Sequence, residues 1–144
     1  MRVSQVLKGK GGGLIKAAPD ERVWAVLRRF QTHGIGTLVV TDDEGRLLGT
    51  LGERDVILGL ATKGKNLLEF TVGDVMATDV PTCTPDEAIG QVEQLMTARR
   101  TRHIPVIDGD TVIGVISVGD VVKARLDDDE LENRILRDLA RARE

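Results

Sequence analysis

Apolar residues recur every three or four positions in two stretches of the chain. The first stretch follows Pro19 and the second follows Pro85, and each proline begins a Pro-Asp-Glu triplet. This spacing predicts a helix that buries one face, and a proline followed by acidic residues is typical of a helix start. We therefore predict two amphipathic helices that begin near these prolines, with inward-facing Val23, Val26, Leu27 and Phe30 in one and Ile89, Val92, Leu95 and Met96 in the other.

Each predicted helix is followed by two β-rich runs. GTLVVTD and RLLGTL flank the turn DDEG, and HIPVID and TVIGVIS flank the turn DGD. Two such runs on either side of an Asp/Gly turn predict a hairpin. A further helix is predicted to begin near residues 53–55 after the first hairpin and near 119–120 after the second. A short strand, around LIKAA or VPTCT, is predicted before the first helix of each set.

The two sets of elements are copies of one another. VSQVL (3–7) aligns with VGDVM (72–76), APDERVWAVLRRF with TPDEAIGQVEQLM, and LLGTLGERDVI with VIGVISVGDVV. Such self-similarity indicates a tandem repeat. The predicted fold is α+β or α/β, with two small sheets, each packed by two helices and related by pseudo-two-fold symmetry. The expected organisation is a first repeat over 1–60, a linker over 61–71, a second repeat over 72–125 and a C-terminal helix over 126–144.

The predicted C-terminal helix carries Leu131, Ile135 and Leu139 at a spacing of four. Such a stripe usually packs on a core, but on a terminal helix it can also dock a partner subunit.

Composition places the chain among ordinary globular proteins. Of 144 residues, 41% are hydrophobic and 30% charged, and the net charge of −3 provides no basic field to attract nucleic acid or anionic lipid. Aromatic residues are only 2%, which leaves little surface for stacking bases. Cys83 is the single cysteine, and no signal peptide or membrane-spanning run is visible. We expect a cytoplasmic protein that contacts neither nucleic acid nor membrane.

One element carries a family resemblance. IGVISVGD, preceded by RHIPVID and by a Pro-Asp-Glu helix start, resembles the cystathionine β-synthase (CBS) domain, and the two copies in order resemble the tandem pair called a Bateman module. The resemblance covers residues 3 to about 123 and implies a stand-alone regulatory protein that binds an adenosyl ligand and forms a homodimer.

The resemblance also implies roles for individual residues. In the family, an Asp at the start of the second helix contacts the ribose hydroxyls, a Ser or Thr three residues earlier holds ribose or phosphate, the short strand contacts adenine, and basic residues near the hairpin meet phosphates. One implied site combines Asp120 with Ser117, Pro81, Thr82, Thr84, Arg102, His103, Ile104 and Pro105, and the other combines Asp55 with Arg54, Lys16 and Ala17.

Physical chemistry supports these assignments. A carboxylate accepts hydrogen bonds from a ribose diol, a helix N-terminus favours anions, and arginine forks fit phosphate oxygens. Gly119 lets a ligand approach the backbone. On this reasoning Arg102 and His103 would hold the phosphates of the nucleotide whose ribose Asp120 binds.

Simpler interpretations exist for several of these residues. Asp55 and Asp120 also suit helix caps, and Arg99 and Arg100 suit the C-terminal end of a solvated helix. The first copy departs from the pattern, because Gly52 replaces Ser117, and Gly34 and Gly36 replace Arg100 and Arg102. That half-site is therefore expected to bind weakly, to bind a less charged ligand, or to form one wall of the other site.

Other motifs give no chemistry. KGKGGG (8–13) lacks the Ser or Thr of a phosphate-binding loop and precedes a strand, so a flexible loop is predicted, whose lysines could close over a ligand. DDDE (127–130) lacks the spacing of a calcium loop. His33 is expected to be structural or solvent-facing, and Cys83 to be buried and unreactive.

The leading hypothesis is a non-enzymatic sensor that needs no cofactor and binds AMP, ATP or NAD as a regulatory ligand in the cleft between the repeats. ADP and S-adenosylmethionine share the same adenosine, but the arginines favour a phosphorylated ligand. The alternative is a ligand-free dimerisation or interaction scaffold. Neither a nucleophile–base pair nor metal-ligand spacing supports an enzyme.

Overall fold

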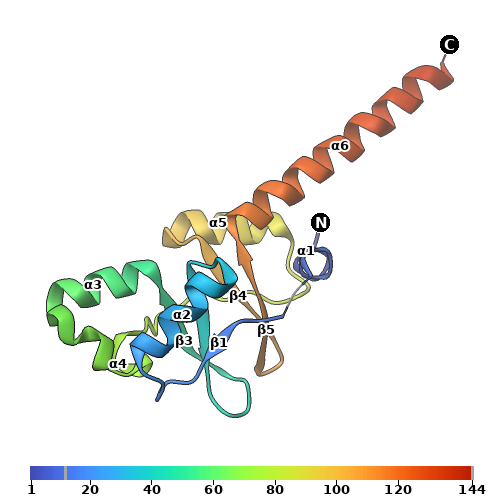
Figure 1. Ribbon diagram of the computed structural model, residues 1–144. Coiled ribbons are helices and arrows are strands. Elements are labelled where there is room, and N and C mark those ends of the chain that lie inside the picture. The colour runs from blue at the N-terminus through green and yellow to red at the C-terminus, as the bar shows by residue number, and fades with distance from the viewer. Residues whose placement is uncertain (12, 144) are drawn as a thin grey trace.

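The computed structural model describes residues 1–11 and 13–143. In chain order, the elements are α1 (Val3–Lys10), β1 (Lys16–Ala17), α2 (Val23–His33), β2 (Thr37–Thr41), β3 (Leu47–Gly52), α3 (Glu53–Lys63), the 3-10 helix η1 (Gly64–Glu69), α4 (Val72–Val75), α5 (Ile89–Arg99), β4 (His103–Asp108), β5 (Thr111–Ser117) and α6 (Val118–Ala142). Figure 1 shows this order along the chain.

Each repeat contains the predicted hairpin. Strands β2 and β3 pair antiparallel, with Thr37 opposite Gly52, and β4 and β5 pair antiparallel, with His103 opposite Ser117. Strand β1 adds to the first sheet in parallel with β2. In the second repeat the matching short strand is reduced to one parallel bridge between Cys83 and Val106.

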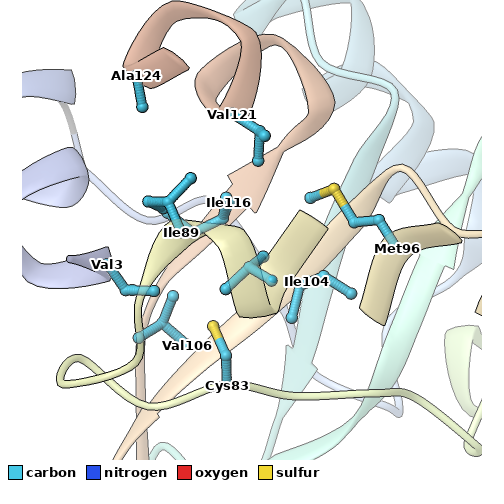
Figure 2. Packing of buried hydrophobic residues seen from close by; sticks show 10 residues of the cluster. Val3, Cys83, Ile89, Met96, Ile104, Val106, Ile116, Val121 and Ala124 are labelled. Carbon is cyan, nitrogen blue, oxygen red and sulfur yellow. The ribbon is translucent and has the colours of Figure 1, made fainter. Parts of the chain in front are cut away.

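The buried side chains form two clusters, and each cluster contains a helix from the other half of the sequence. Val72 of α4 belongs to the cluster of the first repeat, with Ala17, Val26, Leu38, Val40 and Leu51. Val3 of α1 belongs to the cluster of the second repeat, and Figure 2 shows its side chain pointing into this cluster. The other labelled members are Cys83, Ile89, Met96, Ile104, Val106, Ile116, Val121 and Ala124. The helix that precedes each repeat in sequence therefore packs on the other repeat.

Backbone hydrogen bonds join the two halves in matching pairs. The N–H of Val3 donates to the carbonyl of Glu87 at 2.9 Å, and the N–H of Val72 donates to the carbonyl of Glu21 at 2.8 Å. In the same way, Ile89 donates to Met1, and Val23 donates to Phe70. This reciprocity is the predicted pseudo-two-fold relation between the repeats.

The prediction that α2 and α5 begin at the prolines is wrong. Pro19 and Pro85 lie in turns, and the helices begin at Val23 and Ile89. The Glu21 carboxylate accepts the N–H of Ala18 at 2.8 Å, so it closes the turn that precedes the helix. The first N–H groups of both helices donate instead to backbone carbonyls across the repeat boundary, which removes the need for an acidic first turn.

Two segments predicted as irregular are helical. The expected linker is occupied by the end of α3 and by η1, whose Leu67 is fully buried. Within the expected loop KGKGGG, residues 8–10 complete α1, and Gly12 lies outside the described residues. As predicted, the C-terminal helix continues from the last helix of the second repeat, since α6 is unbroken from Val118 to Ala142.

Among residues 1–11 and 13–143, no helix combines the length and the apolar character that crossing a membrane requires.

Candidate functional site

Two cavities lie between the repeats, and both repeats line each of them. The lysine cavity, of about 370 Å³, is lined chiefly by Lys10, residues 13–15, residues 34–37, His103, residues 113–115 and Ser117. The arginine cavity, of about 420 Å³, is lined chiefly by Gly36, Thr37, Thr50, residues 52–55, Ala77, residues 79–81 and residues 99–103. Volumes of this size suit small-molecule ligands.

An ion pair stands at the wall of the lysine cavity. Ser117 caps α6, because its hydroxyl accepts the N–H of Asp120 at 3.1 Å while the Asp120 carboxylate accepts the N–H of Ser117 at 2.8 Å. The ammonium of Lys10 donates to Oδ2 of Asp120 at 2.8 Å and to the carbonyl of Val115 at 2.8 Å. Lys10 therefore occupies one oxygen of the carboxylate that family resemblance assigns to ribose.

The charge state of Asp120 follows from these contacts. Burial alone would raise the pKa of Asp120, but the hydrogen bonds from Lys10 and Ser117 outweigh it and hold the pKa below its ordinary value. Asp120 is therefore a carboxylate at neutral pH.

His103 and Thr37 form a wall that the two cavities share. They occupy matching positions at the starts of β4 and β2. Burial lowers the pKa of His103, and the positive charges of Lys10 and Arg102 lower it further against the opposing effects of Asp120 and Glu53. The imidazole is therefore neutral at pH 7, and an anionic ligand beside it would raise its pKa.

The arginine cavity combines a helix-start carboxylate with guanidinium groups. Asp55 of α3 is half-buried and accepts the N–H of Gly52 at 2.8 Å, which repeats the Asp120 arrangement without the capping hydroxyl. Arg54 from the first repeat joins Arg99, Arg100 and Arg102 from the second around this cavity. Arg99 is paired with Asp79 at 3.0 Å. Asp55 and three of these four arginines thus come from opposite repeats.

Arg100 has an unusual backbone conformation. It ends α5 at φ 51° and ψ 45°, in the left-handed region, and within the described part of the chain it is the one non-glycine residue with positive φ. Its counterpart at the end of α2 is Gly34, at φ 61° and ψ 37°. A non-glycine residue there costs about 1 kcal/mol. The chain tolerates this strain at a position whose side chain lines the arginine cavity.

The structure separates residues that the sequence grouped. Ser117, the N-cap of the helix that carries Asp120, lines the lysine cavity. Arg102 and Pro81 instead line the arginine cavity, together with Asp55 and Arg54. The cavity linings therefore place Arg102 with Asp55 of the other repeat, whereas Asp120 lines neither cavity and its predicted pairing with Arg102 around one ligand stays a prediction. His103 is the member of the predicted set that borders both cavities.

The other predicted site residues, Asp120 among them, lie outside the residues that line these two cavities, and Asp120 contacts the lysine cavity only through Lys10 and Ser117. Ile104 and Pro105 are buried in β4, and Ala17 is buried in β1. The carbonyl of Lys16 accepts a hydrogen bond from Arg29. Thr82 and Thr84 flank Cys83 at the surface, and Gly119 is exposed in the first turn of α6.

Some lining residues escaped sequence reasoning. No role was predicted for Thr37, although Thr37 aligns with His103 in the repeat and could have been predicted as a ligand contact for that reason. Arg99 and Arg100 were assigned to a solvated helix end, and Lys10 to a loop. Their places in the cavities depend on how the two repeats face each other, which the sequence of one repeat does not encode.

The described residues hold little that suggests metal or thiol chemistry. Across residues 1–11 and 13–143, no three His, Cys, Asp or Glu side chains gather as a metal site would require. Burial, with a smaller contribution from Glu87, raises the pKa of the Cys83 thiol to about 12. Cys83 is therefore a protonated core residue at neutral pH.

Comparison with known proteins agrees with this architecture. The family model described as CBS domain matches residues 13–62 and 72–127. The CBS domain-containing protein CBSX3, mitochondrial, of Arabidopsis thaliana is 35% identical over 130 residues, which are 85% of this chain and 63% of that protein. The chain thus spans less than two-thirds of that relative's length.

Solved structures share the fold. The CBS-domain containing protein ATU1752 from Agrobacterium tumefaciens superposes with a TM-score of 0.81 at 35% identity, over 87% of this chain and 99% of that one. The CBS domain pair of protein MJ0100, solved in complex with 5′-methylthioadenosine and S-adenosyl-L-methionine, has a TM-score of 0.76 at 24% identity, over 90% of this chain and 98% of that one. Because the family's domain matches twice across most of the chain, the protein belongs to the CBS domain family.

Proposed function

We propose that this protein is a regulatory module that binds a phosphorylated adenine nucleotide, AMP, NAD or ATP, in the arginine cavity. The observation that carries the proposal is the joining of Asp55, at the start of α3, with Arg99, Arg100 and Arg102 of the other repeat around one cavity. The carboxylate accepts hydrogen bonds from the ribose diol. The guanidinium groups neutralise the phosphates.

Occupancy is transmitted through the contact between the repeats. The nucleotide contacts Asp55 and Arg54 of one repeat and Arg100 and Arg102 of the other, so binding favours the arrangement in which both sets meet. A ligand shifts a conformational equilibrium by its differential affinity for the two states. The shared wall of Thr37 and His103 conveys occupancy of the arginine cavity to the lysine cavity.

The lysine cavity suits a less charged adenosyl ligand. Its polar groups include Lys10, which is paired with Asp120, the neutral His103 and the hydroxyls of Thr37 and Ser117. A ribose diol that binds Asp120 must share the carboxylate with Lys10 or displace it. This cavity therefore binds more weakly than the arginine cavity, and it accepts a ligand without phosphates.

The adenosyl class of ligand is supported by the relative solved with 5′-methylthioadenosine and S-adenosyl-L-methionine. The preference for a phosphorylated ligand in the arginine cavity rests on the arginines of this chain. The bound nucleotide is a signal and not a substrate, so no hydrolysis of it is expected.

A thermal-shift panel of AMP, ADP, ATP, NAD and S-adenosylmethionine tests the proposal. A ligand at 100 times its dissociation constant adds about 2.7 kcal/mol of stability, which for a chain of this size raises Tm by roughly 5–10 °C. We expect such a rise with a phosphorylated nucleotide and its loss in Arg102→Ala. Arg137→Ala is the control, because Arg137 is exposed on α6 and lines neither cavity, and we expect this variant to keep the rise in Tm.

A ligand-free interaction scaffold is the second candidate function, favoured by the exposed apolar residues Leu131, Ile135 and Leu139 of α6. A flat thermal-shift panel from a chain that self-associates would favour this candidate over the nucleotide sensor.

A further inference from the structure

The distal half of α6 has an exposed apolar stripe. Figure 1 shows α6 extending away from the rest of the molecule toward the C-terminus. The stripe consists of Leu131, Ile135 and Leu139, which are 55%, 51% and 57% exposed. Side chains of this size and exposure in a regular row favour an interaction surface over a solvated face.

This stripe continues the face of α6 that is buried nearer its start. Val121 and Ala124 pack in the cluster of the second repeat. At 3.6 residues per turn, the two buried residues and the three stripe residues fall within about 80° of one another around the helix axis. The stripe therefore lies on the same side of the helix as the buried residues, and Asp128, which pairs with the N-terminal ammonium group of Met1 at 3.5 Å, separates the two apolar parts.

Charges are segregated along the same half of the helix. Residues 127–132 contain five acidic side chains and no basic one, and residues 133–143 contain four arginines and one aspartate. The helix dipole does not explain the acidic run, because its effect is confined to the first turn and Asp127 is the tenth residue of α6. The stripe thus has an acidic end and a basic end.

We propose that this half of α6 pairs with the same segment of a second copy of the chain in antiparallel orientation, centred on Ile135. Leu131 then packs against Leu139 of the second copy, and the acidic run lies beside the arginines. A parallel pairing would instead place acid against acid and arginine against arginine, which is unfavourable. The charge distribution therefore selects both the occupant and its direction. The inference does not depend on nucleotide binding.

Sedimentation equilibrium of the full chain tests the surface. We expect a reversible dimer that Ile135→Lys weakens at least tenfold. Each dimer of the variant places two ammonium groups where two isoleucines were buried, and the lost apolar burial alone corresponds to roughly a tenfold change or more. Leu136→Lys is the matched control: Leu136 is 56% exposed on the same helix but lies about 100° around the axis from Ile135, and we expect it to retain the dimer. Circular dichroism checks that both variants remain folded.

Charge reversal tests the direction. Asp127 and Arg141 are 14 residues apart, about 21 Å along one helix, so they cannot pair within it. In the antiparallel pairing Asp127 lies near Arg141 of the second copy. Asp127→Arg and Arg141→Asp should each weaken the dimer, and the double variant should restore it. Failure of the double variant to recover would overturn the antiparallel arrangement.

Two further results would overturn the proposal itself. One is a wild-type chain that stays monomeric up to about 100 µM, a concentration above the dissociation constants of most specific complexes. The other is a dimer that survives Ile135→Lys but is lost in Ile57→Lys, which would place the interface on the exposed apolar face of α3. Either result leaves the nucleotide proposal unaffected.

Discussion

The ammonium of Lys10 lies 2.8 Å from Oδ2 of Asp120, although the two residues are 110 positions apart in sequence. The contact exists because α1 packs on the second repeat and not on the repeat that it precedes. One consequence is that a lysine of a segment predicted to be a loop neutralises the carboxylate at the start of α6.

The Lys10–Asp120 pair predicts a specific pH dependence of stability. The pKa of Asp120 is lower in the folded state than its ordinary value of 3.8. The pair therefore stabilises the fold fully above pH 3.8, and the contribution is lost as the pH falls through the lowered value. We expect Lys10→Met to reduce the free energy of unfolding by about 1 kcal/mol at pH 7, a small value because the lysine is partly exposed to solvent.

Urea unfolding at a series of pH values measures this effect. The difference between the wild type and Lys10→Met should disappear in strongly acidic solution, where Asp120 is protonated in both. Lys8→Met, on the exposed side of α1, is the control. A difference that persists unchanged at the lowest pH would contradict the ion pair as its source.

Replacing Arg100 is expected to change the stability of the fold and the affinity for AMP in opposite directions. Arg100→Gly relieves the left-handed strain at the end of α5, so we expect it to raise the free energy of unfolding by about 0.5–1 kcal/mol. The same change removes a positive charge from the arginine cavity and should weaken AMP binding. Gly34→Ala, at the matching position of the first repeat, should be destabilising by about 1 kcal/mol. Denaturant unfolding and calorimetric titration provide the two measurements, and an Arg100→Gly variant that is less stable would contradict the strain argument.

Alanine substitution is expected to lower the free energy of unfolding by different amounts at two glycines in the strands. A Cβ at Gly49 would lie 2.3 Å from the backbone carbonyl oxygen of Ala77, whereas a Cβ at Gly114 would lie 2.7 Å from the end of the Leu7 side chain. A side chain can rotate away, but a hydrogen-bonded backbone cannot. We expect Gly49→Ala to destabilise by about 3 kcal/mol and Gly114→Ala by about 1 kcal/mol. Thermal unfolding compares them, and equal losses would contradict the predicted order.

Local patterns predicted the elements well. The helices α2 and α5, both hairpins and the starts of α3 and α6 follow from apolar spacing and turn residues, which act within a few positions of the chain. The helix starts at Val23 and Ile89 were missed because their first N–H groups bond to carbonyls of the other half, a contact that no local pattern contains.

Site composition was predicted less well, for the same reason. The sequence identified Asp55, Asp120, Arg102 and His103 as candidate ligand contacts in the cleft between the repeats, but it grouped each Asp with the strand and hairpin residues of its own repeat. The structure combines the helix start of one repeat with the loop and hairpin start of the other, so Arg102 and Asp55 share a cavity. Predicting this needs the packing of the repeats, which depends on long-range contacts such as Val3 with the second core.

Calorimetric titration of AMP into the wild type, Asp55→Ala and Asp120→Ala tests the central claim most directly. Both variants lose the bond from a carboxylate to a backbone N–H at a helix start, and Asp120→Ala also loses the ion pair with Lys10, so circular dichroism first checks that each variant is folded at the titration temperature. If the arginine cavity holds the phosphorylated nucleotide, Asp55→Ala should weaken AMP binding at least tenfold, roughly the loss of one charge-assisted hydrogen bond, while Asp120→Ala retains near wild-type affinity. Loss of AMP binding in Asp120→Ala with wild-type affinity in Asp55→Ala would contradict the account.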